Sequence, residues 1–269
     1  MKINLILTGL LVSAFGTQSP SEYSDTLSAK VLPSVEHNTF AKGEKLSFQI
    51  SYGWIDAGEA TLEIKNEHHV FNGRDAFHVV GLGNSTGTFN WFFKVRDRYE
   101  TYVDSEGVFP WKFVRDIHEG GYETKQTYSF DQMNEKVTDH KKRQYDVPLG
   151  VQDMISSFYK ARTIDFSNVR PGDVFEMEAF VDNEVWPLKV KYLRNEQKEV
   201  GDRVFDCMVF VPLVQKGRIF KKEEDMMVWV TNDKNKIPVL AEAQVLVGSI
   251  SMKLTDYSGL KHKVAVVEQ

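Results

Sequence analysis

The sequence predicts an all-β protein with one or two short helices, built on a curved antiparallel sheet that forms an open or closed barrel-like clamp. Short runs rich in Val, Tyr, Phe, Trp and Thr alternate polar and apolar residues, which is the period of a half-buried strand. Turn-forming residues separate these runs at short intervals. About a dozen strands of this kind make an antiparallel meander. Because open twisted sheets rarely exceed about ten strands, the sheet must curl, close or fold on itself.

The first sixteen residues have the pattern of a secretory signal peptide. Lys2 precedes a mostly apolar run over residues 3–15, and the small residues Ala14 and Gly16, spaced by Phe15, offer a cleavage site. The run is too short to span a bilayer as a helix, which needs about twenty apolar residues. We therefore expect export and a mature chain without a transmembrane segment.

The remaining chain is predicted to hold one large domain. After the apolar run the chain is polar, contains Pro20 and Pro33 and has no sustained period, so we expect a flexible linker over residues 17–39. A single barrel-like β domain is expected over residues 40–262, and a C-terminal tail over residues 263–269.

The strands begin with clear alternation. Apolar and polar residues alternate over residues 45–52 and again over residues 60–64. Asn72 and Gly73 then precede the strand-like run 76–82, and this dipeptide supplies the positive φ angles of a tight hairpin turn. Further turn sequences stand at residues 104–107, 120–121, 131–134, 182–183, 201–202 and 232–235.

One segment, residues 151–162, breaks the strand pattern. Its apolar residues fall at helical spacing, so we expect an amphipathic helix of about three turns. Asp153 in the first turn and Arg162 in the last suit the helix dipole. The apolar stripe must cover something, most simply an open side or end of the sheet. A second, shorter helix is expected over residues 88–93.

Arg162 is in line with the apolar stripe of this helix, four residues after Phe158. One interpretation is a C-terminal dipole partner, worth under about 1 kcal/mol when exposed. The other is a guanidinium that reaches into the sheet and pairs with a carboxylate or with carbonyl oxygens, which would lock the helix over the opening.

Composition and charge exclude some classes of function. The formal net charge of −5 gives no excess of Lys and Arg for a nucleic-acid partner. Apolar residues make up 42% of the chain, which is enough for a sizeable core. The only cysteine, Cys207, cannot form an internal disulfide, and its alternation with Phe205 and Val209 predicts a small buried apolar side chain.

No catalytic, metal or cofactor site is expected. Residues 83–87 match G-x-S-x-G, the nucleophile elbow of α/β-hydrolases, but that elbow needs a mostly parallel sheet with crossover helices. A hydrolase using Ser85 is therefore the third hypothesis. None of the seven histidines forms a recognised ligand pattern, and the adjacent His68 and His69 would point to opposite faces of a strand.

Aromatic side chains supply most of the candidate ligand-binding residues. In a small closed barrel they would fill the interior, and in a wider, incompletely closed one they would line an apolar cavity. Periodicity does not choose between these two. The candidate ligand-binding residues are Trp54, Trp91, Phe92, Phe93, Phe158, Arg162 and Trp229.

Three segments carry a resemblance to a known family. Residues 43–48 look like G-E-x-L-x-(F/Y), residues 153–162 look like D-x-(I/L)-S-x-(F/L)-Y-x-x-R, and residues 229–238 look like W-x-(S/T)-x-D-x-x-K-(I/L)-P. In this order they resemble the exported bacterial family called domain of unknown function 3108, over most of residues 40–260. The resemblance implies a curved, barrel-like sheet in the periplasm of a Gram-negative bacterium. It implies no enzyme and assigns no functional residue.

We therefore expect a non-catalytic, exported periplasmic protein that binds or shelters an apolar or amphipathic cell-envelope molecule, such as a lipid, a lipoprotein or a glycolipid. The alternative is an envelope scaffold or protein-docking module with a filled core. The inside of the sheet distinguishes them: a hollow interior favours a ligand, and one filled by Phe92, Trp229 and their neighbours favours docking of an envelope protein partner.

Overall fold

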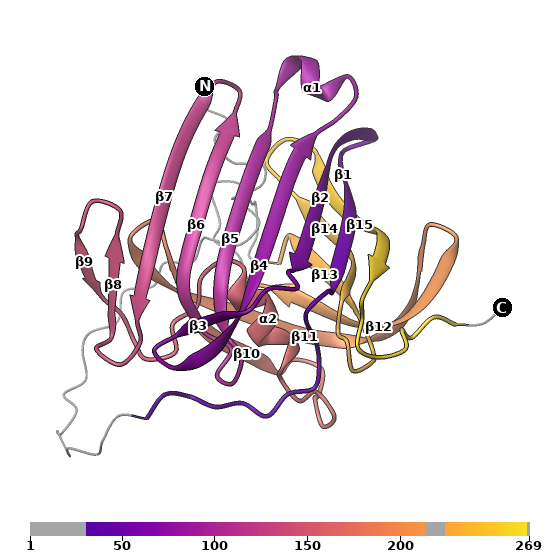
Figure 1. Cartoon of the computed structure of the whole chain (residues 1–269). Coiled ribbons are helices and arrows are strands. Elements are labelled where there is room, and N and C mark those ends of the chain that lie inside the picture. The colour runs from indigo at the N-terminus through magenta and orange to yellow at the C-terminus, as the bar shows by residue number, and fades with distance from the viewer. Residues whose placement is uncertain (1–30, 214–223, 268–269) are drawn as a thin grey trace.

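Fifteen strands form a single antiparallel sheet in the part of the chain that the structure describes, residues 31–213 and 224–267 (Figure 1). The computed structural model confirms the predicted fold class, because the sheet is curved, neighbouring strands are antiparallel, and the two edge strands do not pair with each other. The expected signal peptide, residues 1–16, lies outside the described residues. Within the described ranges, no helix has both the length and the apolar character needed to cross a membrane.

The first half of the chain builds one part of the sheet as a meander. Its strands are β1 (Lys45–Tyr52), β2 (Ile55–Ile64), β3 (His69–Phe71), β4 (Arg74–Ser85), β5 (Arg96–Asp104), β6 (Pro110–Glu119), β7 (Tyr122–Asp131), β8 (Lys136–Asp139) and β9 (Gln144–Asp146). Asn72 (φ 50°) and Gly73 (φ 79°) form the tight turn between β3 and β4, as the sequence predicts.

The second half of the chain starts at the opposite edge of the same sheet and returns toward β1. Its strands are β10 (Val174–Val181), β11 (Glu184–Val200), β12 (Arg203–Pro212), β13 (Met226–Thr231), β14 (Pro238–Gln244) and β15 (Ser249–Ser258). The last strand, β15, pairs with β1, so the first strand of the chain lies in the middle of the sheet. The two edge strands of the sheet are β10 and β9.

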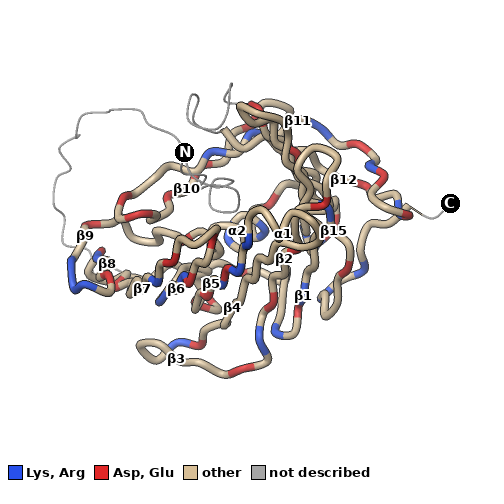
Figure 2. The backbone as a smooth tube through the Cα atoms, turned by 90° about the horizontal axis from the view of Figure 1, so that it is seen from above, with Lys and Arg blue, Asp and Glu red and all other residues tan. Residues whose placement is uncertain are grey.

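The segment between β9 and β10 crosses the concave side of the sheet and carries the helix α2 (Ser156–Arg162). Figure 2 shows α2 inside the curve, with β10 and β11 on one side and β4 to β7 on the other. The helix is shorter than the predicted 151–162. Gln152 instead pairs with β10, because its N–H donates to Glu178 O and its carbonyl accepts the N–H of Phe180, both at 2.8 Å.

Asp153 sets the start of α2. Its Oδ1 accepts the backbone N–H groups of Ile155 (2.7 Å) and Ser156 (2.8 Å), while Ser156 Oγ accepts the N–H of Asp153 (2.8 Å). This reciprocal arrangement is a capping box, which satisfies amides that a helix start leaves without partners. The other helix, α1 (Phe89–Phe92), has four residues where residues 88–93 were predicted.

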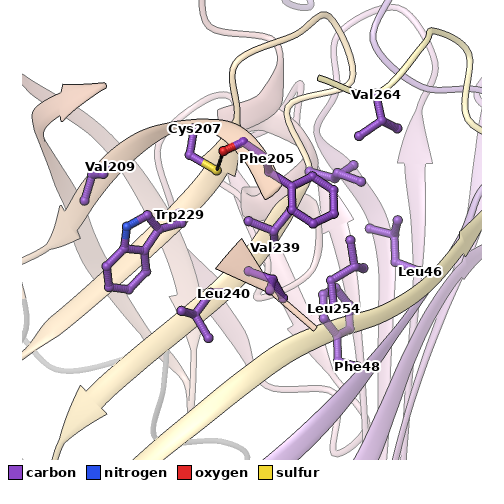
Figure 3. Close-up of a cluster of buried hydrophobic side chains, with 12 residues drawn as sticks. Leu46, Phe48, Phe205, Cys207, Val209, Trp229, Val239, Leu240, Leu254 and Val264 are labelled. Carbon is purple, nitrogen blue, oxygen red and sulfur yellow. Dashed lines mark hydrogen bonds between the residues drawn. The ribbon is translucent and has the colours of Figure 1, made fainter. Parts of the chain in front are cut away.

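A cluster of buried apolar side chains joins β1 to the C-terminal strands (Figure 3). Phe205, Cys207 and Val209 alternate along β12 and pack with Trp229 of β13. Burial raises the pKa of the Cys207 thiol to about 12, so the thiol stays protonated at neutral pH. Cys207 therefore packs as a small apolar side chain.

Residues outside the predicted limits of the domain also contact the sheet. The backbone N–H of Val35 donates to Glu106 O (2.7 Å), and Thr39 is buried. At the other end, Val264 is buried and Val266 forms a β-bridge with Phe205. Contacts with the sheet thus extend beyond the boundaries predicted at residues 40 and 262.

Candidate functional site

An apolar cavity of about 420 Å³ lies between α2 and the concave face of the sheet. Phe48 and Leu62 line it from β1 and β2, Ile155 and Phe158 from the crossover segment, and Val228 from β13. The polar or charged residues among those that line it are Thr61, Ser157, Arg162, Lys189 and Lys236. A concave, mostly apolar space of this size is typical of sites that bind small molecules.

The hairpin of β10 and β11 forms one wall of the cavity. Phe175 and Met177 alternate along β10, and Met177 lies opposite Leu188 of β11, so the three side chains share the face that lines the cavity. At the alternate positions of the hairpin, Glu176 and Lys189 lie opposite each other and form an ion pair (3.2 Å), and Lys189 also borders the cavity. The hairpin is therefore amphipathic. Because its apolar side chains face the open space of the cavity, they are only half-buried.

A buried ion pair fixes α2 below the cavity. Arg162 donates from Nη1 to Glu44 Oε1 (2.6 Å), from Nη2 to Glu44 Oε2 (2.8 Å) and from Nε to Asn235 O (2.9 Å). The side chains of Arg162 and Glu44 are only 3% and 0% exposed. Of the two interpretations of Arg162, the structure shows the one in which the guanidinium reaches into the sheet.

The three sequence motifs meet at this ion pair. Glu44 belongs to the first motif, Arg162 ends the second, and Asn235 lies in the third. The rings of Phe40 and Phe158 lie with their centroids 5.3 Å from the guanidinium carbon, within the range of cation–π contact. Residues far apart in the sequence thus share one buried charged contact.

The opposite end of α2 is tied to β5. The carboxylate of Asp153, which caps the helix, also accepts a hydrogen bond from the hydroxyl of Thr101. Asp153 is fully buried, and this burial raises the pKa of its carboxyl to about 6, although the hydrogen bonds from Thr101, Ile155 and Ser156 favour the ionised form.

The structure separates the seven candidate ligand-binding residues. Phe158 and Arg162 border the cavity. Trp229 is buried in the cluster of Figure 3 instead, where its Nε1 donates to Glu196 Oε1 (2.5 Å). Phe93 is half-buried, with its ring against Gly120.

Trp54, Trp91 and Phe92 are 92%, 89% and 87% exposed, so they neither fill the interior nor line the cavity. They gather at one end of the sheet with Leu246 and Val247. The turns after β1 and β14 and the α1 loop after β4 lie at this end, because β14, β15, β1, β2, β4 and β5 are antiparallel neighbours (Figure 1). These five exposed residues are called the apolar rim below.

Ser85 of the G-x-S-x-G sequence is buried and closes the loop around α1. Its hydroxyl donates to Asn90 Oδ1 (2.8 Å) and accepts the backbone N–H of Val95 (2.8 Å). Both interactions lie within the loop between β4 and β5, and neither involves a histidine that could act as a base. The serine has the contacts of a residue that holds a turn.

The comparisons with known proteins concern family and fold. The model of the family described as "Protein of unknown function (DUF3108)" matches residues 47–255. Among curated proteins, none matches the chain.

Among the solved structures that match this chain are two bacterial proteins. A β-barrel-like protein of the domain of unknown function DUF1849 from Brucella abortus has a TM-score of 0.55 at 10% identity, covering 82% of this chain and 99% of that chain. A DUF1089 family protein from Pseudomonas aeruginosa has a TM-score of 0.39 at 10% identity, covering 70% of this chain and 90% of that one. At 10% identity, the similarity to the Brucella abortus protein shows a shared fold and nothing about function.

The buried ion pair predicts a large effect of a single substitution. Arg162→Ala leaves the Glu44 carboxylate buried without its cation, so we expect the free energy of unfolding to fall by about 3 kcal/mol or more in urea titrations. Arg170→Ala, which alters an exposed arginine, serves as the control and should change it by less than about 0.5 kcal/mol. A loss below about 0.5 kcal/mol for Arg162→Ala would contradict a stabilising role of the pair.

The raised pKa of Asp153 predicts a dependence of stability on pH. Between about pH 4 and pH 6 the folded state retains a proton that the unfolded state releases, so this contribution is fully present below pH 4 and is lost as the pH rises through 6, by about 2 to 3 kcal/mol. Asp153→Asn cannot titrate, and its unfolding free energy should decline less over this range than that of the parent protein. The exposed Asp202→Asn is the control. Equal pH slopes for the parent and Asp153→Asn would rule out the shift.

Proposed function

The chain belongs to the DUF3108 family of proteins of unknown function, and we propose that it is a non-catalytic, exported periplasmic protein that holds the apolar part of a cell-envelope molecule in the cavity above α2. The ligand would be a lipid, a lipoprotein or a glycolipid. The observation that carries this proposal is the cavity itself, since its lining is mostly apolar and lies within the curve of the sheet.

The energetics of burial support an acyl chain as the bound part. Moving a methylene group out of water contributes about 0.8 kcal/mol, so ten buried methylenes supply roughly 8 kcal/mol before the cost of ordering the ligand. The lining includes flexible or aromatic side chains such as Met154, Met177 and Phe210, which adapt to chains of different shape. This favours a class of related lipids over one rigid ligand.

We propose that the apolar rim contacts the bilayer from which the ligand is taken. Among the residues that line the cavity, Ile50 lies near the end of β1 that leads to the rim. The cavity thus extends toward the rim, whose Trp and Phe side chains suit the interface between lipid and water. A bilayer surface is therefore the partner that we assign to the rim.

The other two hypotheses have less support. A docking module with a filled core conflicts with the cavity, although an envelope protein remains the alternative partner for the rim. A hydrolase would need Ser85 as its nucleophile, and the Ser85 hydroxyl already makes two hydrogen bonds within its own loop.

The ligand proposal predicts a molecule that co-purifies with the protein. Native mass spectrometry of the full chain should show bound lipid, and a fluorescent fatty acid should bind and be displaced by extracted envelope lipids. Met177→Glu places a carboxylate in the cavity wall and should weaken binding of the probe by about tenfold or more. Val174→Glu makes the same kind of change on the same strand, outside the lining, and should bind as the parent does. A parent protein with neither co-purified lipid nor probe binding would refute the proposal.

The bilayer proposal predicts binding to phospholipid vesicles in sedimentation assays. The combined variant Trp54→Ser, Trp91→Ser and Phe92→Ser removes the aromatic part of the rim and should reduce the bound fraction on the order of tenfold. Val70→Ser changes an exposed apolar residue on β3, away from the rim, and should have no effect. Vesicle binding that is absent, or equal in both variants, would contradict this assignment and leave an envelope protein as the partner of the rim.

A further inference from the structure

A group of potential metal ligands lies on the face of the sheet opposite the cavity. Thr101 of β5 points to the concave side, where it bonds Asp153, so its neighbour Tyr102 points to the convex side. His78 of β4 lies opposite Tyr102 and shares this convex face. His69 of β3 and Glu67 lie beside His78 and complete the group.

The strand register explains why these residues meet. β3 pairs with β4 so that His69 lies opposite Ala76, and the same register carried two residues further brings Glu67 opposite His78. Glu67 and His69 are two residues apart and therefore share one face. The adjacent His68 points elsewhere, with its Nδ1 at 3.9 Å from Asp75.

The donor atoms are close enough to share one cation. Glu67 Oε2 lies 2.9 Å from His69 Nε2 and 2.8 Å from His78 Nδ1, and the three atoms are all within 4.8 Å of one another. Zinc bonds of about 2.0 to 2.2 Å to nitrogen and oxygen require donor atoms about 3.3 Å apart in a tetrahedral site. Small side-chain rotations provide that spacing.

His78 is oriented as metal-binding histidines are. Its second ring nitrogen, Nε2, lies 2.8 Å from Glu100 Oε2, and Arg98 donates to the other oxygen of Glu100 (2.7 Å). A carboxylate on the far nitrogen fixes the ring so that the near nitrogen faces the ion. The ring is also stacked on Tyr102, with the centroids 4.5 Å apart and the planes at 2°.

The charge of the group favours a cation. Among the ion pairs of the described residues, the carboxylate of Glu67 takes part only in those with His69 and His78. Glu67 is also exposed, so an ion in solvent can reach it. Two imidazoles and one carboxylate suit Zn²⁺ and similar transition-metal ions better than Mg²⁺ or Ca²⁺.

We propose that Glu67, His69 and His78 bind one divalent transition-metal ion, with water completing its coordination and Glu100 positioning His78. The site is independent of the cavity and of the ligand proposed for it, because none of the four residues lines the cavity.

Calorimetric titration of the chelator-treated full chain with ZnCl₂ tests this site. We expect one Zn²⁺ per chain, a loss of affinity of at least about tenfold in His69→Ala and in Glu67→Gln, and a loss of about 10- to 100-fold in Glu100→Gln. His68→Ala is the matched control and should bind as the parent does. His69 is half-exposed, so its variant should fold, which circular dichroism can verify.

Two results would overturn the proposal. One is a parent protein that binds no Zn²⁺ under these conditions. The other is a His69→Ala variant whose affinity equals that of His68→Ala, which would mean that zinc binds elsewhere on the surface.

Discussion

The ion pair between Arg162 and Glu44 is the contact on which the arrangement of the molecule depends. Removing two charges from water is unfavourable, and here a bidentate pair and the carbonyl of Asn235 offset this cost. The contact joins the residue before β1, the end of α2 and the turn between β13 and β14. A helix of seven residues is too short to be stable alone, so its place is set by such tertiary contacts.

The helix is held at both ends, and this defines the space above it. Asp153 ties its start to Thr101 of β5, and Arg162 ties its end to Glu44 beside β1. These two strands belong to the same part of the sheet, whereas the β10–β11 hairpin comes from the opposite edge. The cavity lies between the β10–β11 hairpin at one edge and strands from the middle of the sheet, such as β1 and β2, and the short helix occupies only part of this space.

Local patterns in the sequence predict the strands, the Asn72-Gly73 turn and the direction of Arg162, because each depends on neighbours within a few residues. They do not identify Glu44 as the partner, since nothing local marks one carboxylate among 38 acidic residues. The sequence pattern places the start of α2 too early. Residue 152 pairs with β10 instead, and this contact joins residues far apart in the sequence, which local periodicity does not reveal. Aromatic content alone does not show whether Trp54, Trp91 and Phe92 are buried or exposed. The alternation of polar and apolar residues, which assigns strand residues to a face, ends before the loops that carry these three. The Glu67–His78 contact needs the strand register, which the hairpin turn would have supplied.

The position of β1 between β2 and β15 has a consequence for how the protein reaches its folded state. Lys45 pairs with Ser258, so the middle of the sheet is completed only when a segment from near the end of the chain arrives. Pairing over so long a separation is slow, because the entropy of closing the loop is lost before the contacts form. A chain that emerges N-terminus first therefore exposes one edge of β1 until its last hairpin is available. Until that hairpin forms, the open edge of β1 can pair with a strand of another chain.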